Sequence, residues 1–131
     1  MTGRYLRDAR LYEDARGRSG IRSELVRIGR SDPRALRTIQ NKIGLLRQQT
    51  LDDALRSRLI KRPSKHIYVL RVQSGPAAYR LPFFESPCGG ALIVLTSVEH
   101  RRDLGRERAY GALIEGAERL RTDWITRNCK E

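Results

Sequence analysis

The segment spanning residues 67–84 constrains the fold of this chain most. Residues 67–72 (IYVLRV) and 78–84 (AYRLPFF) alternate between apolar and polar side chains, a pattern typical of β-strands. The linker between them, residues 73–77 (QSGPA), is rich in turn-forming residues. The segment therefore predicts a β-hairpin. Pro82 has no backbone N–H to give to a neighbouring strand, so we expect an edge position or a bulge there.

Each strand of this hairpin carries one arginine. If the strands pair symmetrically about Gly75 and Pro76, Arg71 lies directly opposite Arg80, whereas a register slip of one residue would separate them. Two like charges that face each other destabilise a strand pair, so we expect an anion between them. In a chain with a formal charge of +12, the anion we expect is a phosphate.

The charge balance supports a polyanionic partner. The chain has 131 residues, with 27 Lys and Arg against 15 Asp and Glu. Such an excess favours nucleic acid as the partner. Two alternatives stay open: a GC-rich genome that raises arginine usage, and an acidic protein partner. The length predicts a single domain over residues 1–131.

The sequence contains no signal for a membrane, a metal or a cofactor. It has no apolar run long enough to span a bilayer, and the first residues lack the apolar stretch of a signal peptide. We therefore expect a cytoplasmic protein. Cys88 and Cys129 lie far apart without ligand-like neighbours, and the only histidines are His66 and His100. We expect reduced thiols, no metal site and no cofactor.

Helices are predicted on both sides of the hairpin in sequence. Ser19 is a suitable N-cap for a helix that ends at Gly29, and Asp32 followed by Pro33 begins a second helix. The apolar positions that give these two helices their periodicity are Ile21, Leu25, Ile28, Leu36, Ile39, Ile43 and Leu46. Residues 51–59 predict a further short helix, and residues 104–127 predict the last one.

The remaining segments complete a small sheet. Residues 91–98 form a continuous apolar run, typical of a central strand that is buried on both faces. Residues 4–12 predict a first strand, while residues 60–66 and 99–103 read as charged loops. The order is strand, helix, helix, three antiparallel strands, helix. It predicts an α+β domain in which an N-terminal helical hairpin and a C-terminal helix pack on one side of the sheet.

Several of these motifs together resemble the RelE/ParE/HigB toxin superfamily of type II toxin–antitoxin systems, and most closely its HigB-like, phage-derived branch. The resemblance covers roughly residues 10–125. It rests on residues 12–17 (YEDARG), 58–59 (RL), 67–71 (IYVLR), 79–84 (YRLPFF) and 93–95 (IVL), with a basic loop and a helix after them. Val69 stands where the family usually has an acidic residue, and His100 and Arg101 stand where two lysines are common.

The resemblance implies a RelE-like fold and a ribosome-dependent endoribonuclease that cleaves translated mRNA without a metal. Its partners would be mRNA on the ribosome, rRNA and a cognate antitoxin, usually one with a helix-turn-helix domain. Some relatives instead poison DNA gyrase. Two alternatives therefore stay open: a non-nucleolytic or degenerate toxin, and a plain RNA-binding module.

Cleavage by attack of a 2′-hydroxyl on the adjacent phosphate needs a base, an acid and cations that stabilise the phosphorane. Arg80, and after it Arg71, are the candidates for phosphate stabilisation, because a guanidinium binds phosphate through two N–H groups and stays charged. The alternative is an arginine on the solvent face of a strand, paired with an acid such as Glu85. His100 is the candidate acid or base, and the alternative is an exposed loop histidine.

A second set of basic residues is predicted to grip the RNA backbone. This set comprises Lys61, Arg62, Lys65, His66 and Arg101. The resemblance adds Arg102 as a catalytic arginine. It also adds Tyr110 as a tyrosine that stacks on the substrate or assists catalysis.

Overall fold

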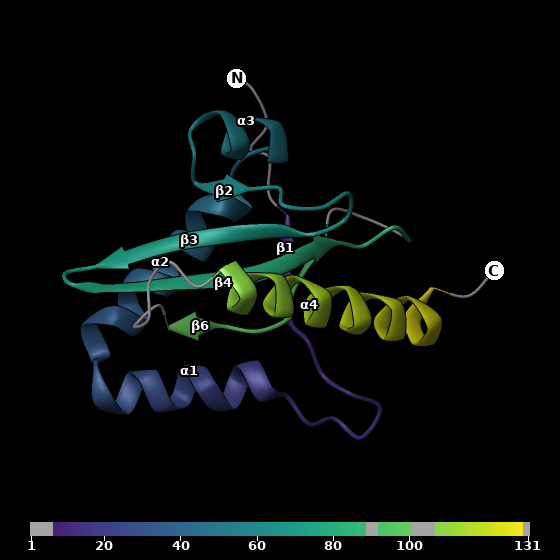
Figure 1. The fold of residues 1–131 in the computed structure, drawn as a ribbon, viewed down its shortest axis with the longest axis horizontal. Helices are drawn as coiled ribbons and strands as arrows, with labels where there is room; N and C mark the ends of the chain where they lie inside the picture. The colour runs from purple at the N-terminus through teal and green to yellow at the C-terminus, as the bar shows by residue number, and fades with distance from the viewer. Residues whose placement is uncertain (1–6, 89–91, 101–106, 130–131) are drawn as a thin grey trace.

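The computed structural model describes residues 7–88, 92–100 and 107–129, which form an α+β fold (Figure 1). The helices are α1 (Gly20–Ser31), α2 (Pro33–Arg47), α3 (Leu51–Arg56) and α4 (Glu107–Asn128). The strands are β1 (Asp8–Leu11), β2 (Ile60–Lys61), β3 (Tyr68–Ser74), β4 (Ala77–Glu85), β5 (Leu92–Leu95) and β6 (Glu99–His100). Within the described ranges, no helix is both long enough and apolar enough to cross a bilayer.

The strands form one mixed sheet in the order β1-β5-β4-β3-β2, with β6 also paired to β4. β1 runs parallel to β5, and the other pairs are antiparallel. β5 therefore lies between two strands, and three of its four residues are buried. This confirms the central strand that the apolar run predicted.

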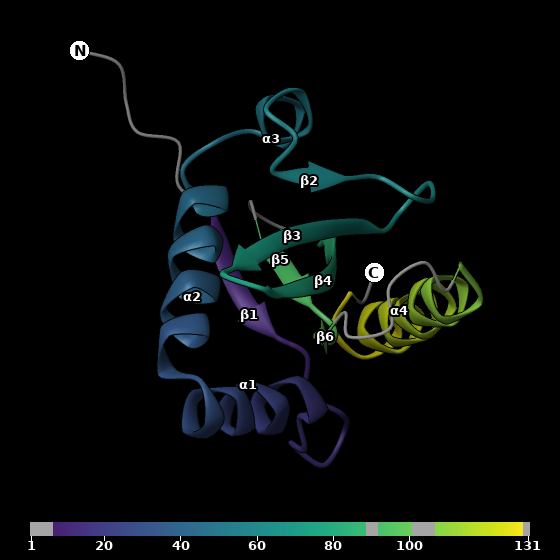
Figure 2. The same ribbon diagram turned by 60° about the vertical axis from the view of Figure 1, so that its left-hand side comes forward.

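Helices cover both faces of the sheet, which corrects the prediction that all of them pack on one side. Figure 2 shows α2 on one side of the strands and α4 on the other. The larger apolar core joins α1, α2 and α3 to the face of the sheet that carries Leu70, Leu81 and Ile93. A smaller core joins α4 to the opposite face, through residues that include Phe84 and Val94. Alternation along the strands produces the two cores, because neighbouring residues point to opposite faces.

The predicted caps begin α1 and α2. The Ser19 hydroxyl accepts the N–H of Arg22 at 3.2 Å, and the Asp32 carboxylate accepts the N–H of Ala35 at 3.1 Å. Gly29 does not end α1, as the sequence had suggested, because α1 continues to Ser31. A Cβ added at Gly29 would lie 2.7 Å from Leu36 Cδ2. The glycine therefore serves the close packing of α1 against α2 instead of ending the helix.

The end of α3 is a Schellman motif with an arginine at the position that usually holds glycine. The N–H of Leu59 donates to the carbonyl of Ala54 at 3.0 Å, and the N–H of Arg58 donates to the carbonyl of Leu55 at 3.1 Å. Arg58 has a φ of 65°, in the left-handed region that disfavours residues with a Cβ. The backbone therefore holds Arg58 in a strained conformation immediately before β2.

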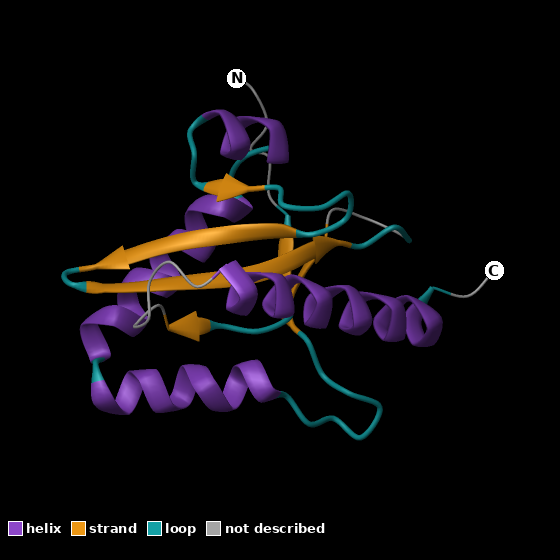
Figure 3. Ribbon diagram, viewed as in Figure 1, coloured by secondary structure: helices purple, strands orange, loops and turns teal. Residues whose placement is uncertain are grey.

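Two segments that were predicted as loops contain short strands. Ile60–Lys61 pairs with β3, and Glu99–His100 pairs with β4, where Figure 3 shows it as the short arrow of β6. Of the edge position or bulge predicted at Pro82, the edge position is wrong, because β4 lies between β3 and β5. On this side of β4, residues 83–85 pair with β5 and residues 79–80 pair with β6. Pro82 falls between the two ladders, where its missing N–H interrupts neither.

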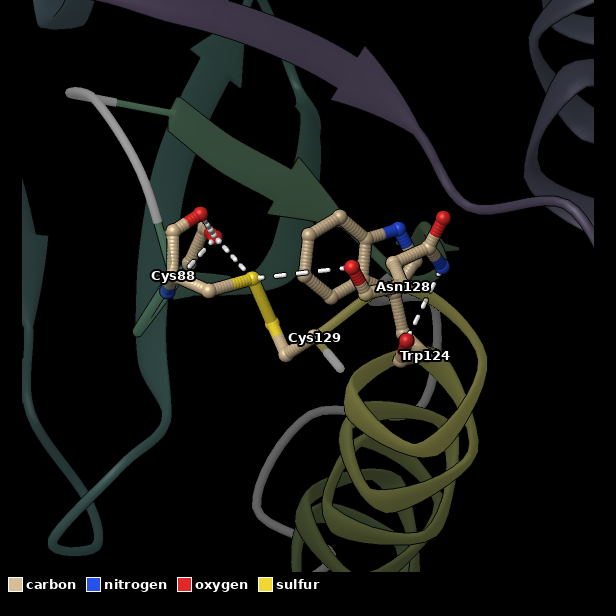
Figure 4. The surroundings of a disulfide bond; sticks show 5 residues. Cys88, Trp124, Asn128 and Cys129 are labelled. Atoms are coloured by element: carbon tan, nitrogen blue, oxygen red, sulfur yellow. Dashed lines mark hydrogen bonds between the residues drawn. A yellow bond between two sulfur atoms is a disulfide. The ribbon is translucent and has the colours of Figure 1, made fainter. Parts of the chain in front are cut away.

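A disulfide joins Cys88 to Cys129, so the expectation of reduced thiols is wrong (Figure 4). The cysteines are 41 residues apart in sequence, but their Cα atoms lie 5.5 Å apart. They meet because α4 brings its C-terminal end to the segment that follows β4. A long-range contact of this kind has no sequence signal. Disulfides are typical of oxidising compartments. The predicted cytoplasmic location therefore loses the support that free thiols would have given it, and it stays a prediction.

A polar cluster fixes the same end of α4 to Tyr12 and Glu13, the two residues that follow β1. The Tyr12 hydroxyl donates to the Asp123 carboxylate, and Arg127 donates to that carboxylate at 2.8 Å and to the Glu13 carbonyl at 2.6 Å. Burial, and then the hydrogen bond to Asp123, raise the pKa of Tyr12. The hydrogen bond from Arg127, followed by that from Tyr12, holds the pKa of Asp123 below its usual range.

The disulfide should make the stability of the fold depend on redox state. Reduction, or the double substitution Cys88→Ser and Cys129→Ser, should lower the free energy of unfolding by about 2–4 kcal/mol, because the unfolded chain is no longer cross-linked. Thermal melts with and without dithiothreitol measure this. The double variant is the control, since dithiothreitol should not change its melting temperature. Free thiols in the untreated wild type, found by mass spectrometry, would contradict the disulfide.

Candidate functional site

The β3–β4 hairpin pairs symmetrically about Gly75 and Pro76, and this one of the two registers left open by the sequence places the two arginines opposite each other. The register pairs Arg71 with Arg80, and the turn between the strands contains Gly75 at a φ of 57°. Directly paired residues of an antiparallel ladder point to the same face of the sheet. Both guanidinium groups therefore project from one face, the face that packs against α4.

Tyr110 of α4 meets Arg80 on this face. The guanidinium carbon of Arg80 lies 4.4 Å from the centre of the Tyr110 ring, a cation–π contact. Arg71, by contrast, is exposed to solvent. The pair thus combines one arginine that is held in place with one that is accessible.

Glu99 provides the counter-charge that the sequence analysis assigned to an external phosphate. The Nε of Arg80 lies 2.6 Å from Oε1 of Glu99. The Arg80 and Glu99 side chains are only 16% and 21% exposed, so solvent screens this ion pair less than it screens a surface pair. The fold therefore offsets one of the two facing positive charges itself. Nothing in the local sequence identified Glu99, because the contact depends on the pairing of β6 with β4.

These side chains surround a pocket of about 450 Å³. The described residues that line it are Lys61, Pro63, Arg71, Arg80 and Tyr110. Four of these five were predicted site residues: Lys61, Arg71, Arg80 and Tyr110. Three of them are cations and no carboxylate is among the described lining residues, so the pocket suits an anionic group such as a phosphate.

The basic loop between β2 and β3 borders this pocket through Pro63. The Arg62 guanidinium donates to the Lys65 carbonyl, from Nε at 3.2 Å and from Nη2 at 2.6 Å, and lies 5.3 Å from the ring centre of Tyr68. Arg62 therefore holds the loop in shape. Lys65 and His66 are exposed, where they can contact a nucleic-acid backbone.

His100 does not reach the pocket. It pairs with Tyr79, and the two rings stack with their centres 4.7 Å apart. Tyr79 belongs to the core beneath α1 and α2, so His100 lies on the face of the sheet opposite to Arg80. The structure thus separates the predicted acid or base from the predicted phosphate-binding arginines. Arg101 and Arg102 lie outside the described residues.

Comparison with known proteins adds no assignment: no protein-family model matches this chain, and no curated protein matches it significantly.

The contact between Glu99 and Arg80 predicts how two substitutions should differ. Glu99→Gln removes the negative charge but keeps an acceptor for the Arg80 N–H, so inorganic phosphate should bind several-fold more tightly than to the wild type. Glu99→Ala removes the same charge and also the acceptor. We expect it to bind phosphate more weakly than Glu99→Gln does, because Arg80 is no longer oriented. Titration calorimetry measures both affinities.

A result in which Glu99→Ala binds phosphate as tightly as Glu99→Gln would show that Glu99 acts only through its charge. Glu24→Gln is a matched control, because Glu24 pairs with Arg27 on α1, which does not line the pocket. It should leave phosphate binding unchanged.

Proposed function

We propose that this chain is an mRNA endoribonuclease of the RelE/HigB type, a toxin that cleaves translated mRNA on the ribosome without a metal. Its partners are then mRNA, rRNA and a cognate antitoxin that carries a helix-turn-helix domain. The observation that carries the proposal is the pocket in which Lys61, Arg71 and Arg80 converge beside Tyr110. The net charge of +12 supports a polyanionic substrate.

In the proposed reaction, the 2′-oxygen of a ribose attacks the adjacent phosphorus. The bond from this oxygen to phosphorus forms, and the bond from phosphorus to the 5′-oxygen breaks. The products are a 2′,3′-cyclic phosphate and a free 5′-hydroxyl. Negative charge builds up on the phosphorane oxygens, where the two guanidinium groups and the Lys61 ammonium stabilise it.

Two protons must move during this reaction: one leaves the 2′-hydroxyl and one reaches the 5′-oxygen. Among the described residues that line the pocket, Lys61 and Tyr110 carry groups suited to proton exchange. The Glu99 carboxylate lies next to Arg80. His100 lies on the opposite face of the sheet. We therefore assign proton transfer to Lys61, Tyr110 and Glu99 instead of to His100.

A second candidate function is a non-catalytic RNA-binding module with the same basic pocket. The observation that favours it is the position of His100, because the imidazole expected to transfer protons stacks on Tyr79, away from the pocket. Both functions require that the pocket bind a phosphodiester. They differ in whether the bound RNA is cut.

Inducible expression in bacteria, with mapping of mRNA 5′ ends, distinguishes these functions. The wild type should arrest growth and cut translated mRNA. Arg80→Ala should reduce cleavage by about 10²-fold or more, because a cation that faces the phosphorane is lost. His100→Ala should retain most of the cleavage, since its ring lies on the other face.

Arg27→Ala serves as a control with the same loss of charge, because Arg27 is an exposed residue of α1. It should cleave like the wild type. If growth stops while the mRNA stays intact and the SOS response is induced, the nuclease proposal is wrong and the protein is a gyrase poison. Binding of RNA without cleavage would favour the non-catalytic module.

A further inference from the structure

We propose that Arg58 forms a second phosphate subsite beside the first, so that the site holds two neighbouring phosphates of a single-stranded RNA. This inference rests on the proposed RNA-binding function. Arg58 was not among the predicted site residues.

The first line of evidence is a second pocket, of about 140 Å³. Arg58, Gln73 and both hairpin arginines, Arg71 and Arg80, are among its lining residues. Because Arg71 and Arg80 also line the larger pocket, the two pockets have these two lining residues in common. A ligand that occupies both pockets would therefore contact the same pair of arginines.

The second line of evidence is the backbone of Arg58. Its φ of 65° and the Schellman hydrogen bonds around it define a position where glycine is the favoured residue. Strained backbone conformations cluster at active sites, ligand clamps and switch regions. Arg58 thus occupies, at a cost to the fold, a position from which its side chain lines the smaller pocket.

The third line of evidence is how Arg58 is held beside the arginine pair. The N–H of Arg71 donates to the carbonyl of Leu59 at 3.2 Å, which continues the β2–β3 pairing up to the residue after Arg58. The described residues that line the smaller pocket include three arginines and no acidic residue, and of these arginines Arg80 is paired with Glu99. The two pockets together have four cationic residues in their described lining, and a phosphodiester chain presents one negative charge at each step.

The test uses the substitution Arg58→Gly, for which stability and binding should change in opposite directions. Glycine relieves the strain at this position, so the melting temperature should rise by about 2–5 °C. Binding of a short, single-stranded 2′-O-methyl RNA should weaken by about tenfold. This ligand is chosen because it lacks the attacking hydroxyl and stays intact. The slope of log K against log salt should also become shallower by about 0.7.

Two variants control for bulk charge and for side-chain length. Arg56→Ala removes the same charge two residues away, from a side chain that pairs with Asp53 and is not among the pocket lining, and it should bind RNA like the wild type. Arg58→Lys keeps the positive charge and the strain. It should therefore bind more tightly than Arg58→Gly, with a melting temperature near that of the wild type.

The outcomes separate this inference from the proposed function. If Arg80→Ala weakens RNA binding but Arg58→Gly binds like the wild type, the second subsite is wrong and the first pocket stands. If neither substitution weakens binding, or if the wild type does not bind RNA, both proposals are wrong. Equal losses for Arg58→Gly and Arg56→Ala would show a bulk charge effect and would also overturn the subsite.

Discussion

Two guanidinium groups face each other across the β3–β4 ladder, and the arrangement of this side of the molecule depends on them. Like charges in direct register weaken a strand pair. Here Arg80 is held by the Glu99 carboxylate and by the ring of Tyr110, while Arg71 stays exposed opposite to it. The repulsion is therefore offset in part, and a positively charged pocket remains between β2, β3, β4 and α4.

Each contact in this arrangement depends on a different part of the fold. Glu99 reaches Arg80 because β6 pairs with β4, and Tyr110 reaches it because α4 packs across the second face of the sheet. The disulfide and the cluster of Tyr12, Asp123 and Arg127 fix the far end of α4. We infer that these distant contacts contribute to the position of Tyr110 at the pocket.

Local patterns predicted much of this structure. The β3–β4 hairpin follows from the turn residues and the strand alternation, although its register was left open, and Ser19 and Asp32 cap the helices as expected. Features that depend on residues meeting from distant segments had no local signal. Three features are examples: the disulfide, the placement of helices on both faces of the sheet, and the pairing of β6, which puts His100 on the face opposite to the arginines.

The candidate site also contains some residues that the sequence could identify and others that it could not. Its three cations were recognisable from the local sequence: Arg71 and Arg80 interrupt apolar strand patterns, and Lys61 belongs to the basic segment 60–66, which was predicted as a loop. Glu99 and Arg58 were not, since one depends on tertiary pairing and the other on a backbone conformation. The strained φ of Arg58 is visible only in three dimensions.

The most direct test of the central claim is an NMR titration that follows the arginine side-chain N–H signals while a single-stranded 2′-O-methyl RNA is added. The signals of Arg71 and Arg80 should shift together and saturate with one affinity, while that of Arg27, which pairs with Glu24 on α1, should stay in place. Shifts that spread over many arginines without saturation would contradict a phosphate site at the facing pair.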